Sequence, residues 1–468
     1  MNLKACWLVL ALSVFAGCAN PGREEREAAS EAFRAHLVGE TDTWLAANAP
    51  PYRLEQVVGL ARERTLKLTE QDLAAELARI DRATAFSVFL PNLELSMGRE
   101  VFHGKTQVPS LAPTSIRGNR LWANQQSMIL TQPVFTPVAW VMFAETAYGV
   151  RIRDIVRARA GEVLDAQVAA LFYRAVISER LVETYRLQVE SGEALTNRVG
   201  KLADEGYALE GDRARAEARL ADDLLNLQEA KDQREDARMK LCEFVRFWPL
   251  SGASGAFGEL FDGESLLAVR TGAFDGESME ECVWRGLLTR KDLYAGDQTV
   301  ELRKAQVIEA LAGFLPNVVL GGAGAHQGLA GTAIRGWGGG LMATWSAFEG
   351  FRTVQEYRAA RAKREAEFKL QEDRMLSVVT SVAEAYRNLH RCDIQRRAAA
   401  KAKAAAETDY AETARRFEEG EETLSNVLDK LAVKDAAAVQ SISADYSSAL
   451  AEIALRQAMG IGIFEEVK

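Results

Sequence analysis

The cysteines and histidines are the side chains best suited to chemistry in this sequence, and they are few and scattered. Five cysteines and four histidines occur among 468 residues, and no His/Cys group has the spacing of a metal site. Cys242, Cys282 and Cys392 lie far apart in the sequence and give no disulfide framework. No nucleophile-elbow motif brings serine, histidine and aspartate together. We therefore expect no catalytic site, no metal site and no enzymatic activity.

Phosphate and nucleic-acid chemistry are also unsupported by the residue pattern. The glycine run Gly338-Gly339-Gly340 lies in an expected strand and not before a helix, so it does not form a phosphate-binding loop. Glycines at such a position suit a crowded strand. The formal net charge is −9, whereas nucleic acid favours a basic protein face. We expect no nucleic acid among the partners.

The amino terminus carries a motif with its own chemistry. Lys4 precedes an apolar run, and Val14-Phe15-Ala16-Gly17-Cys18 then resembles the cleavage box of bacterial lipoproteins. On this interpretation residues 1–17 are a removed signal peptide, and the Cys18 thiol carries diacylglycerol, with no other cofactor. An ordinary secretory signal with a cysteine nearby is the alternative. By the same resemblance, Ala19 directs the lipoprotein to the outer membrane. Stable anchoring needs more than one acyl chain or a second signal.

A duplicated unit organises the rest of the chain. Phe89-Leu90-Pro91-Asn92-Leu93 is repeated as Phe314-Leu315-Pro316-Asn317-Val318, at an offset of 225 positions. Each copy has a helical segment, a strand, a stretch rich in small residues, a second strand and a very long helix, so we treat the chain as an internal repeat. The expected parts are a signal peptide (1–17), a lipidated extended tether (18–51), a first repeat (52–247), an irregular connector (248–285), a second repeat (286–460) and a C-terminal tail (461–468).

Each repeat should contain one β-hairpin, at residues 86–135 and 314–348. The period changes to two at Phe86, and the second copy has strands at 317–327 and 337–348 joined by a Gly-rich turn through Gly336. One face of each strand is polar and the other apolar, which is typical of membrane β-barrels; a soluble four-stranded sheet is the alternative. Four strands cannot close, and an open edge is not tolerated in lipid, so other subunits must complete the barrel.

Each hairpin is followed by a helix of exceptional length. Residues 138–205 contain no proline, and residues 351–419 form a counterpart, so each helix should be roughly 100 Å long. Gly206 and Gly420 should reverse the chain into return helices, because glycine adopts the left-handed conformation. After the amino terminus, no apolar run is long enough for a membrane helix. The expected class is an α+β membrane protein with membrane strands and long coiled helices.

These residues resemble the TolC-like outer-membrane efflux proteins over roughly residues 50 to 460. The resemblance implies a homotrimer with a 12-stranded β-barrel in the outer membrane and an α-helical barrel in the periplasm. It also implies a passive conduit of a tripartite efflux or type I secretion system, with a periplasmic adaptor and an inner-membrane pump as partners. Besides the repeated strands, the specific motifs are Gln132-Pro133-Val134-Phe135, Trp345-Ser346-Ala347-Phe348-Glu349-Gly350, Arg416-Phe417-x-x-Gly420 and Asn426-Val427-Leu428-Asp429.

The resemblance also implies roles at the periplasmic ends of the helices. Asp429 would line a constricted entrance, together with Asn426 and with Asp212, which holds the position of Asn426 in the first copy. Asn426 departs from the aspartate common in the family. Asp429 is otherwise a solvated helix carboxylate. The positions expected at the helix-turn tips, where an adaptor would dock or the turn would simply be hydrated, are Gly206, Gly420, Glu418, Glu419, Glu421 and Glu422.

A second class of function stays open at this point. A lipid-anchored periplasmic coiled-coil scaffold or adaptor without a pore would explain the long helices and Cys18. It would leave the amphipathic strands without a purpose. The exported cargo is not indicated, because the motifs specify an architecture and not a substrate.

Overall fold

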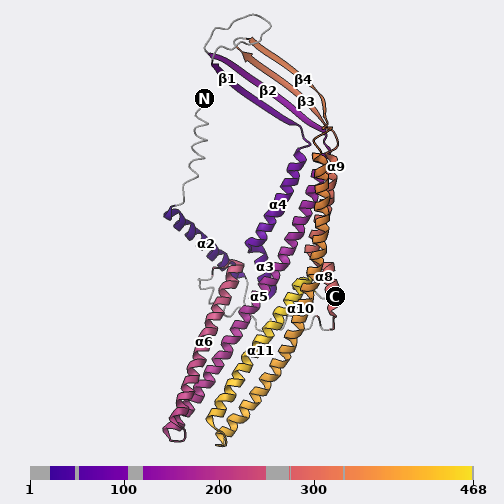
Figure 1. Ribbon diagram of the computed structural model, residues 1–468. Coiled ribbons are helices and arrows are strands. Elements are labelled where there is room, and N and C mark those ends of the chain that lie inside the picture. The colour runs from indigo at the N-terminus through magenta and orange to yellow at the C-terminus, as the bar shows by residue number, and fades with distance from the viewer. Residues whose placement is uncertain are drawn as a thin grey trace. The chain divides into compact units, whose positions relative to one another are not determined.

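A computed structural model describes residues 22–47, 52–103, 120–248, 274, 276–329 and 332–465. The chain is mostly helical with one small antiparallel sheet, as the expected α+β class requires (Figure 1). The signal peptide, Cys18 and most of the expected connector lie outside the described residues. The elements are α2 (Arg23–Ala47), α3 (Leu54–Arg64), α4 (Leu66–Ser87), β1 (Asn92–His103), β2 (Arg120–Phe135), α5 (Pro137–Asp204), α6 (Glu210–Val245), α8 (Met279–Thr289), α9 (Lys291–Ala312), β3 (Asn317–Leu329), β4 (Thr332–Thr344), α10 (Arg352–Glu418) and α11 (Leu424–Met459).

The chain divides into two compact units, and each long helix contributes residues to both. The first unit contains Met1–Leu66, Glu162–Cys282 and Val382–Lys468, and the second contains Lys67–Gly161 and Val283–Ser381. The sheet belongs to the second unit, whereas the turns at Gly206 and Gly420 belong to the first. No helix in the described ranges is long and apolar enough to cross a membrane.

The duplication extends to the lengths of the elements. Helices α3 and α8 have 11 residues each, and α4 and α9 have 22 residues each. Helix α8 begins at Met279, so the expectation of an irregular connector as far as residue 285 is wrong. A capping box starts this helix: Ser278 Oγ accepts from the Glu281 backbone N–H at 3.2 Å, and a Glu281 carboxylate oxygen accepts from the Ser278 N–H at 2.7 Å.

The segment before the first repeat is a helix and not an extended tether. Helix α2 has 25 residues, and Glu24 and Glu25 lie in its first turn, where carboxylates are favoured by the helix dipole. Trp44, near its end, packs against Tyr52 and Phe247, with ring centroids 4.6 Å and 5.3 Å away. This aromatic contact attaches the end of the helix to the first repeat, an interaction that the polar composition of residues 19–50 does not indicate.

The four strands form one antiparallel sheet in the order β1-β2-β3-β4. Helix α4 continues to Ser87 and a turn follows, so the expected change to strand at Phe86 is too early. Gly336 lies inside β4, paired with Ala325, and not in a turn. Glycine belongs in this strand because the backbones approach closely: a Cβ on Gly339 would lie 3.0 Å from the Gly321 carbonyl oxygen.

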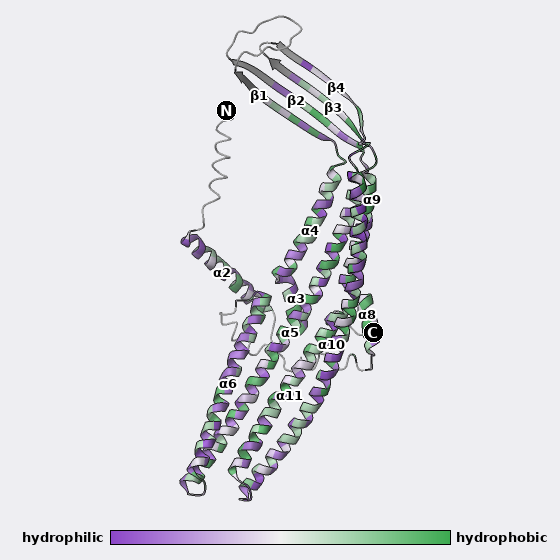
Figure 2. Cartoon of the chain, viewed as in Figure 1, coloured by the Kyte–Doolittle hydropathy of each residue, from purple (hydrophilic) through white to green (hydrophobic). Residues whose placement is uncertain are grey.

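One face of the sheet is apolar and open. The strand register places Leu95, Met128 and Trp337 on this face, and Met97 and Trp337 are 83% and 92% exposed. The opposite face carries polar groups, including the Ser96–Ser127 hydroxyl pair at 2.7 Å. Figure 2 shows the hydrophobic stretches along the strands. In the part of the chain that the structure describes, no strand pairs with the outer edges of β1 and β4.

The long helices form two hairpins. Helices α5 and α10 have 68 and 67 residues, and their return helices α6 and α11 have 36 each. Gly206 and Gly420 adopt φ values of 81° and 78°, the left-handed region that glycine occupies without strain. The backbone N–H of Tyr207 bonds the carbonyl of Leu202 at 2.8 Å, which closes the end of α5.

Candidate functional site

The two helical hairpins meet in a small apolar core close to their turns. Val199 on α5, Ala216 on α6 and Leu424 on α11 are buried against one another. Three partly buried side chains pack against them: Leu195 on α5, Phe417 on α10 and Leu428 on α11. Because the core draws residues from both copies of the repeat, it holds the two hairpin ends together.

A polar contact beside this core joins the two long helices. Arg198 on α5 donates from Nη1 to a carboxylate oxygen of Glu418 on α10 at 2.7 Å. The same guanidinium lies 6.0 Å from the ring centroid of Phe417. The pair is about half exposed, so its contribution to stability is small. Glu418, expected as an adaptor contact, therefore already has a partner within the chain.

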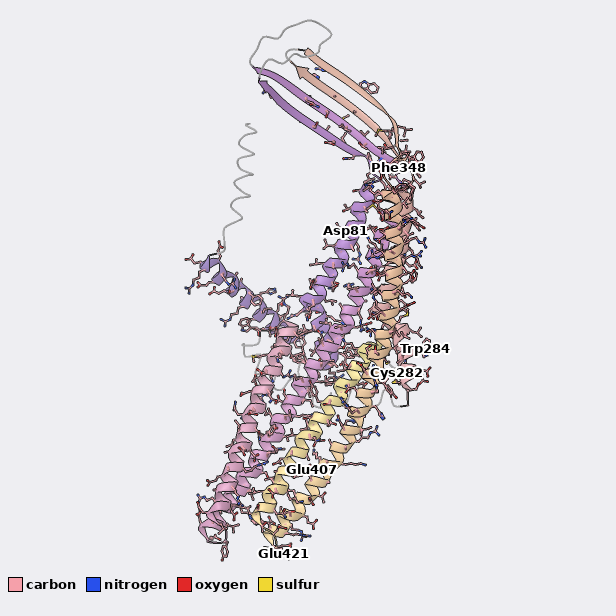
Figure 3. The ribbon with its side chains drawn as sticks, in the orientation of Figure 1. Asp81, Cys282, Trp284, Phe348, Glu407 and Glu421 are labelled. Carbon is pink, nitrogen blue, oxygen red and sulfur yellow. The ribbon has the colours of Figure 1, made fainter. Side chains whose placement is uncertain are left out.

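The other glutamates near the Gly420 turn differ in their surroundings. Glu419 pairs with Arg415, one helical turn before it, at 2.9 Å. Glu422 accepts from the Thr423 backbone N–H at 3.0 Å, and this bond, followed by one from the Asn426 side chain, lowers the pKa of the Glu422 carboxyl. Glu421 lies at the end of the α10/α11 hairpin (Figure 3). The turn therefore presents carboxylates at its outermost point.

Asn426 and Asp212 occupy the same place in the two copies, at the start of a return helix. The Asn426 N–H donates to Oγ1 of Thr423, the N-cap of α11, at 3.4 Å. Asp212 lies in the first turn of α6 and pairs with Arg215 at 3.8 Å. Both residues thus lie in the first turn of a return helix, where backbone N–H groups lack intrahelical partners, and in α11 the Thr423 hydroxyl accepts from one of these groups. Their role at an entrance stays a prediction.

Asp429 lies one helical turn after Asn426 and is exposed. The equivalent residue of the first copy, 214 positions earlier, is Arg215, whose side chain is 65% exposed. Among the residues that the structure describes, Asp429 has no ion pair. The two hairpin ends therefore present opposite charges at equivalent positions. We did not identify Arg215 from the sequence, although applying the offset of the turns to Asp429 would have found it.

A buried ionic cluster joins the hairpins beyond the apolar core. Arg219 on α6 lies 3.1 Å from a carboxylate oxygen of Asp223 and 2.9 Å from one of Asp435 on α11. Asp223 and Asp435 are 1% and 4% exposed. Burial raises the pKa of both carboxyls, and Arg219 opposes this rise. Gln188 on α5 donates to the Asp435 carbonyl at 3.3 Å, so three helices meet here.

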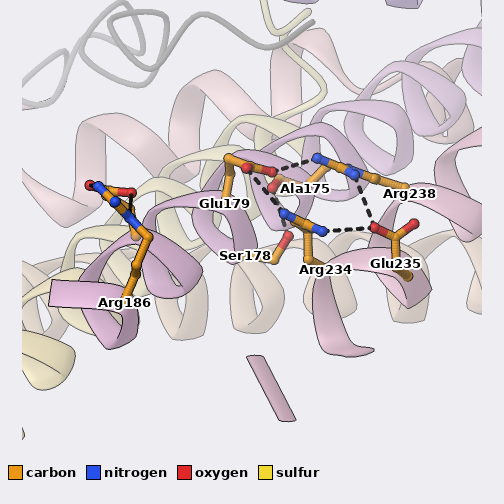
Figure 4. A network of polar contacts seen from close by, with 8 residues as sticks. Ala175, Ser178, Glu179, Arg186, Arg234, Glu235 and Arg238 are labelled. Carbon is orange, nitrogen blue, oxygen red and sulfur yellow. Dashed lines mark hydrogen bonds and ion pairs between the residues drawn. The ribbon is translucent and has the colours of Figure 1, made fainter. Parts of the chain in front are cut away.

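A second polar cluster joins α5 to α6 farther from the turns. Arg238 donates to Glu179 at 2.7 Å and to Glu235 at 3.0 Å, and Arg234 lies against the same two carboxylates (Figure 4). The Arg238 side chain is 6% exposed. Like the Arg219 cluster, this arrangement fixes neighbouring helices through charged side chains that pair with one another.

The described residues include neither a metal-binding cluster nor a reactive cysteine. No group of three or more His, Cys, Asp or Glu side chains there is arranged to hold a metal ion. Cys242, Cys282 and Cys392 are buried free thiols, and burial raises the pKa of the Cys242 thiol to about 12. A thiol with such a pKa is unreactive near neutrality.

The sequence profile of the outer membrane efflux proteins matches residues 285–461. This segment belongs to the outer membrane efflux protein family. It corresponds to the second repeat. The first repeat has the same order of helices and strands, and its helices have nearly the same lengths. No curated protein matches the sequence.

Solved outer-membrane channels have a similar fold to this chain. The Campylobacter jejuni CmeC outer membrane channel is 18% identical, with 90% of each chain covered and a TM-score of 0.70. The Neisseria gonorrhoeae MtrE outer membrane channel, in its open state, is 19% identical over 90% of this chain and 91% of that one, with a TM-score of 0.69. CusC, described in connection with transmembrane channel formation, is 14% identical over 88% and 92%, with a TM-score of 0.73.

These matches confirm two of the expectations. The resemblance to TolC-like outer-membrane efflux proteins is confirmed by the family profile and by the fold. The family consists of channels and not of enzymes, which confirms that the chain is not an enzyme.

Proposed function

We propose that this protein is the outer-membrane channel of a tripartite efflux system, working as a passive trimeric conduit for small molecules across the outer membrane and the periplasm. The family profile and the fold of the solved channels support this function. The energy for export would come from an inner-membrane pump. A type I secretion channel uses the same architecture, and the described residues do not favour it over efflux.

The open four-stranded sheet is the observation that carries the proposal. Its apolar face leaves Met97 and Trp337 more than four-fifths exposed, and its outer edges have no partner among the described residues. In water, an apolar face of this kind marks an interaction surface. In lipid, each unpaired edge would leave backbone groups unsatisfied, so the sheet must close with other chains. Three copies of four strands give a barrel of 12, within the range of known outer-membrane barrels.

The hairpin ends would form the periplasmic entrance of this conduit. Asp429 is exposed near the Gly420 turn, so three-fold assembly would gather three carboxylates around one axis. A ring of carboxylates favours cations and disfavours anions. The three Arg215 side chains, at the equivalent position of the first copy, would moderate that field. Asn426 and Asp212 would lie at the same entrance, in the first turns of α11 and α6.

The periplasmic adaptor and the pump would dock at the same ends. The Gly206 and Gly420 turns are exposed, and Glu419 and Glu421 place carboxylates beside one of them. Glu418 would contribute only after it leaves Arg198. A partner with a basic surface suits this pattern, because opposite charges steer association.

Attachment to the outer membrane would use two signals. The Cys18 lipid would hold the amino terminus, and the barrel would supply the second anchor that a single lipidated residue needs. Helix α2 then connects the lipidated end to the first repeat, with Trp44 packed against Tyr52 and Phe247.

Single-channel recording in planar bilayers tests the proposal. The purified protein should give discrete openings with a conductance independent of any nucleotide. A lipid-anchored scaffold or adaptor without a pore would give none, even though it would still bind the vesicles through its lipid. Protein that is folded and lipidated but electrically silent would therefore overturn the channel in favour of the scaffold.

A further inference from the structure

Along the apolar face of the sheet, the side chains become mostly polar at one row of paired residues. The row crosses all four strands as Met97, Gln126, His326 and Arg335. The adjoining row, closer to the helices in the chain, is Leu95, Met128, Gly324 and Trp337. The two rows are two residues apart along each strand, so they lie on the same face of the sheet. One row is apolar, and the other carries the Arg335 guanidinium and the His326 imidazole.

A hollow of about 500 Å³ lies between these two rows. It forms where Gly324 has no side chain to fill the space between Met128 and Trp337. Leu95, Met128 and Trp337 of one row line it on one side, and Met97, Gln126, His326 and Arg335 of the other row line it on the other side. Residues between the two rows complete the lining: Ser96, Ser127, Ala325 and Gly336. The volume falls within the range of small-molecule sites in proteins, and the lining combines apolar walls with a few polar groups at one end.

The polar end is arranged to receive an anion. The Arg335 Nε–H donates to His326 Nδ1 at 3.1 Å, so the neutral imidazole carries its proton on Nε2. The two terminal guanidinium nitrogens of Arg335 remain able to donate to an oxyanion, for which arginine has a matching planar geometry. Among the described residues, no carboxylate pairs with Arg335. The strand alternation places Glu94 on the opposite face, away from this pair.

The row lies at the height expected of a membrane surface. Trp345, whose Nε1–H donates to the Phe314 carbonyl at 3.1 Å, marks the helix end of the apolar face. Arg335 is ten residues earlier, which is about 33 Å along a strand and about 25 Å across the bilayer at the usual strand tilt. That distance matches the apolar band of an outer-membrane barrel. The guanidinium would thus be level with the headgroups of the leaflet remote from the helices.

We propose that this hollow binds a lipid with a phosphate-bearing headgroup. An acyl chain lies over Gly324 between Met128 and Trp337, and the phosphate accepts hydrogen bonds from Arg335 and from Nε2–H of His326. The inference rests on the proposed function, since it requires the apolar face to be in contact with lipid. Charge selects this occupant: an apolar hollow alone would accept any chain, whereas an arginine at its rim favours a chain that ends in an oxyanion.

Native mass spectrometry of the detergent-solubilised protein tests the site. The probes are phosphatidic acid and a diacylglycerol with the same acyl chains, which differ only in the phosphate. We expect the wild-type assembly to retain phosphatidic acid in preference to diacylglycerol. Arg335→Gln should weaken that retention about tenfold, since it removes charge-assisted hydrogen bonds. His326→Ala should weaken it less. Arg358→Gln, on an exposed part of α10, should leave it unchanged.

Two results would overturn the lipid site. One is equal retention of the two probes by the wild-type protein, which would show a hollow that takes acyl chains without regard to phosphate. The other is an Arg335→Gln variant that retains as much phosphatidic acid as the control Arg358→Gln. If Arg335→Gln does not assemble, the same result with His326→Ala would overturn the site. The same spectra report the number of chains, and the same samples can be tested for conductance. A conducting trimer without phosphate preference would contradict only this inference, whereas a silent monomer would contradict the proposed function.

Discussion

Replacing Arg219 with methionine should loosen the contact between the two helical hairpins. Its guanidinium lies between two carboxylates that are almost inaccessible to solvent, 3.1 Å from Asp223 and 2.9 Å from Asp435. Methionine keeps much of the volume but removes the only charge that both carboxylates share in the described structure. Breaking a buried ion pair by removing one partner costs about 3–5 kcal/mol, because a buried charge is left uncompensated. We expect the lower end, since Lys434 Nζ remains 3.9 Å from Asp435.

The pH dependence of this effect has a definite sign. Burial raises the pKa of the Asp223 and Asp435 carboxyls above the ordinary value of 3.8 in the folded protein. A carboxyl with a raised pKa contributes stability that is complete below its unfolded pKa and is lost as the pH rises through its folded pKa. Without Arg219, both folded pKa values should rise further. The destabilisation by Arg219→Met should therefore be largest at neutral pH and should shrink as the medium is acidified.

Hydrogen exchange of the assembled protein provides the measurement. Amides of α6 and α11 around residues 219–223 and 435 should exchange faster in Arg219→Met, and channel open time in planar bilayers should increase. The triple variant Arg219→Met/Asp223→Asn/Asp435→Asn should recover most of the protection, because it leaves no buried charge behind. Arg213→Met is the matched control, since Arg213 pairs with Glu217 at 3.1 Å on the exposed surface of the same helix.

Protection in Arg219→Met equal to that in Arg213→Met would refute the reasoning. It would mean that the cluster does not hold the hairpins together. Failure of the triple variant to recover protection would refute the electrostatic explanation alone, because loss of packing would then account for the change.

Three further predictions concern the hairpin ends and the anchor. Asp429→Asn should shift the reversal potential in a salt gradient toward lower cation selectivity, with the channel still opening; an unchanged potential would remove Asp429 from the entrance. Gly420→Ala should destabilise the turn by about 1 kcal/mol in chemical unfolding, because its φ of 78° is unfavourable for alanine. The control Gly211→Ala, in the open first turn of α6, should be neutral or slightly stabilising. Equal changes in the free energy of unfolding for Gly420→Ala and Gly211→Ala would contradict this explanation. Cys18→Ala should abolish incorporation of labelled palmitate yet leave the protein in the membrane fraction; retained label would place lipidation elsewhere.

The duplication and the glycine turns could be predicted because their signals are local. The repeated Phe-Leu-Pro-Asn string marks the start of β1 and β3, and Gly206 and Gly420 terminate α5 and α10 through their own backbone conformation. A glycine with positive φ needs no knowledge of distant residues. The long helices followed from the absence of proline over more than 60 residues.

The errors in the expected elements have physical causes. Gly336 lies in a glycine-rich stretch that is typical of a turn, but it belongs to β4 because its backbone pairs with Ala325 of β3, a long-range register that local composition does not reveal. Helix α2 depends on the packing of Trp44 against Phe247, about 200 residues away, which no local pattern reveals. Helix α8 was predictable in principle, since Ser278 and Glu281 form a capping box readable from the sequence.

The polar clusters between the hairpins could not be predicted. Arg219 and Asp223 are four residues apart on one helix, a spacing that normally indicates an exposed pair. Only the arrival of Asp435 from α11 buries them, and that contact spans 216 residues. The hydrogen-bonded pair of His326 and Arg335 was equally hidden, because it depends on the register of β3 with β4.

The central claim is that one chain supplies only part of a closed wall, and its assembled mass tests this most directly. Sedimentation equilibrium of the mature protein in mild detergent should give the mass of three chains, with the edge strands β1 and β4 protected from hydrogen exchange. A single-chain mass, with both edge strands exchanging freely, would contradict the account.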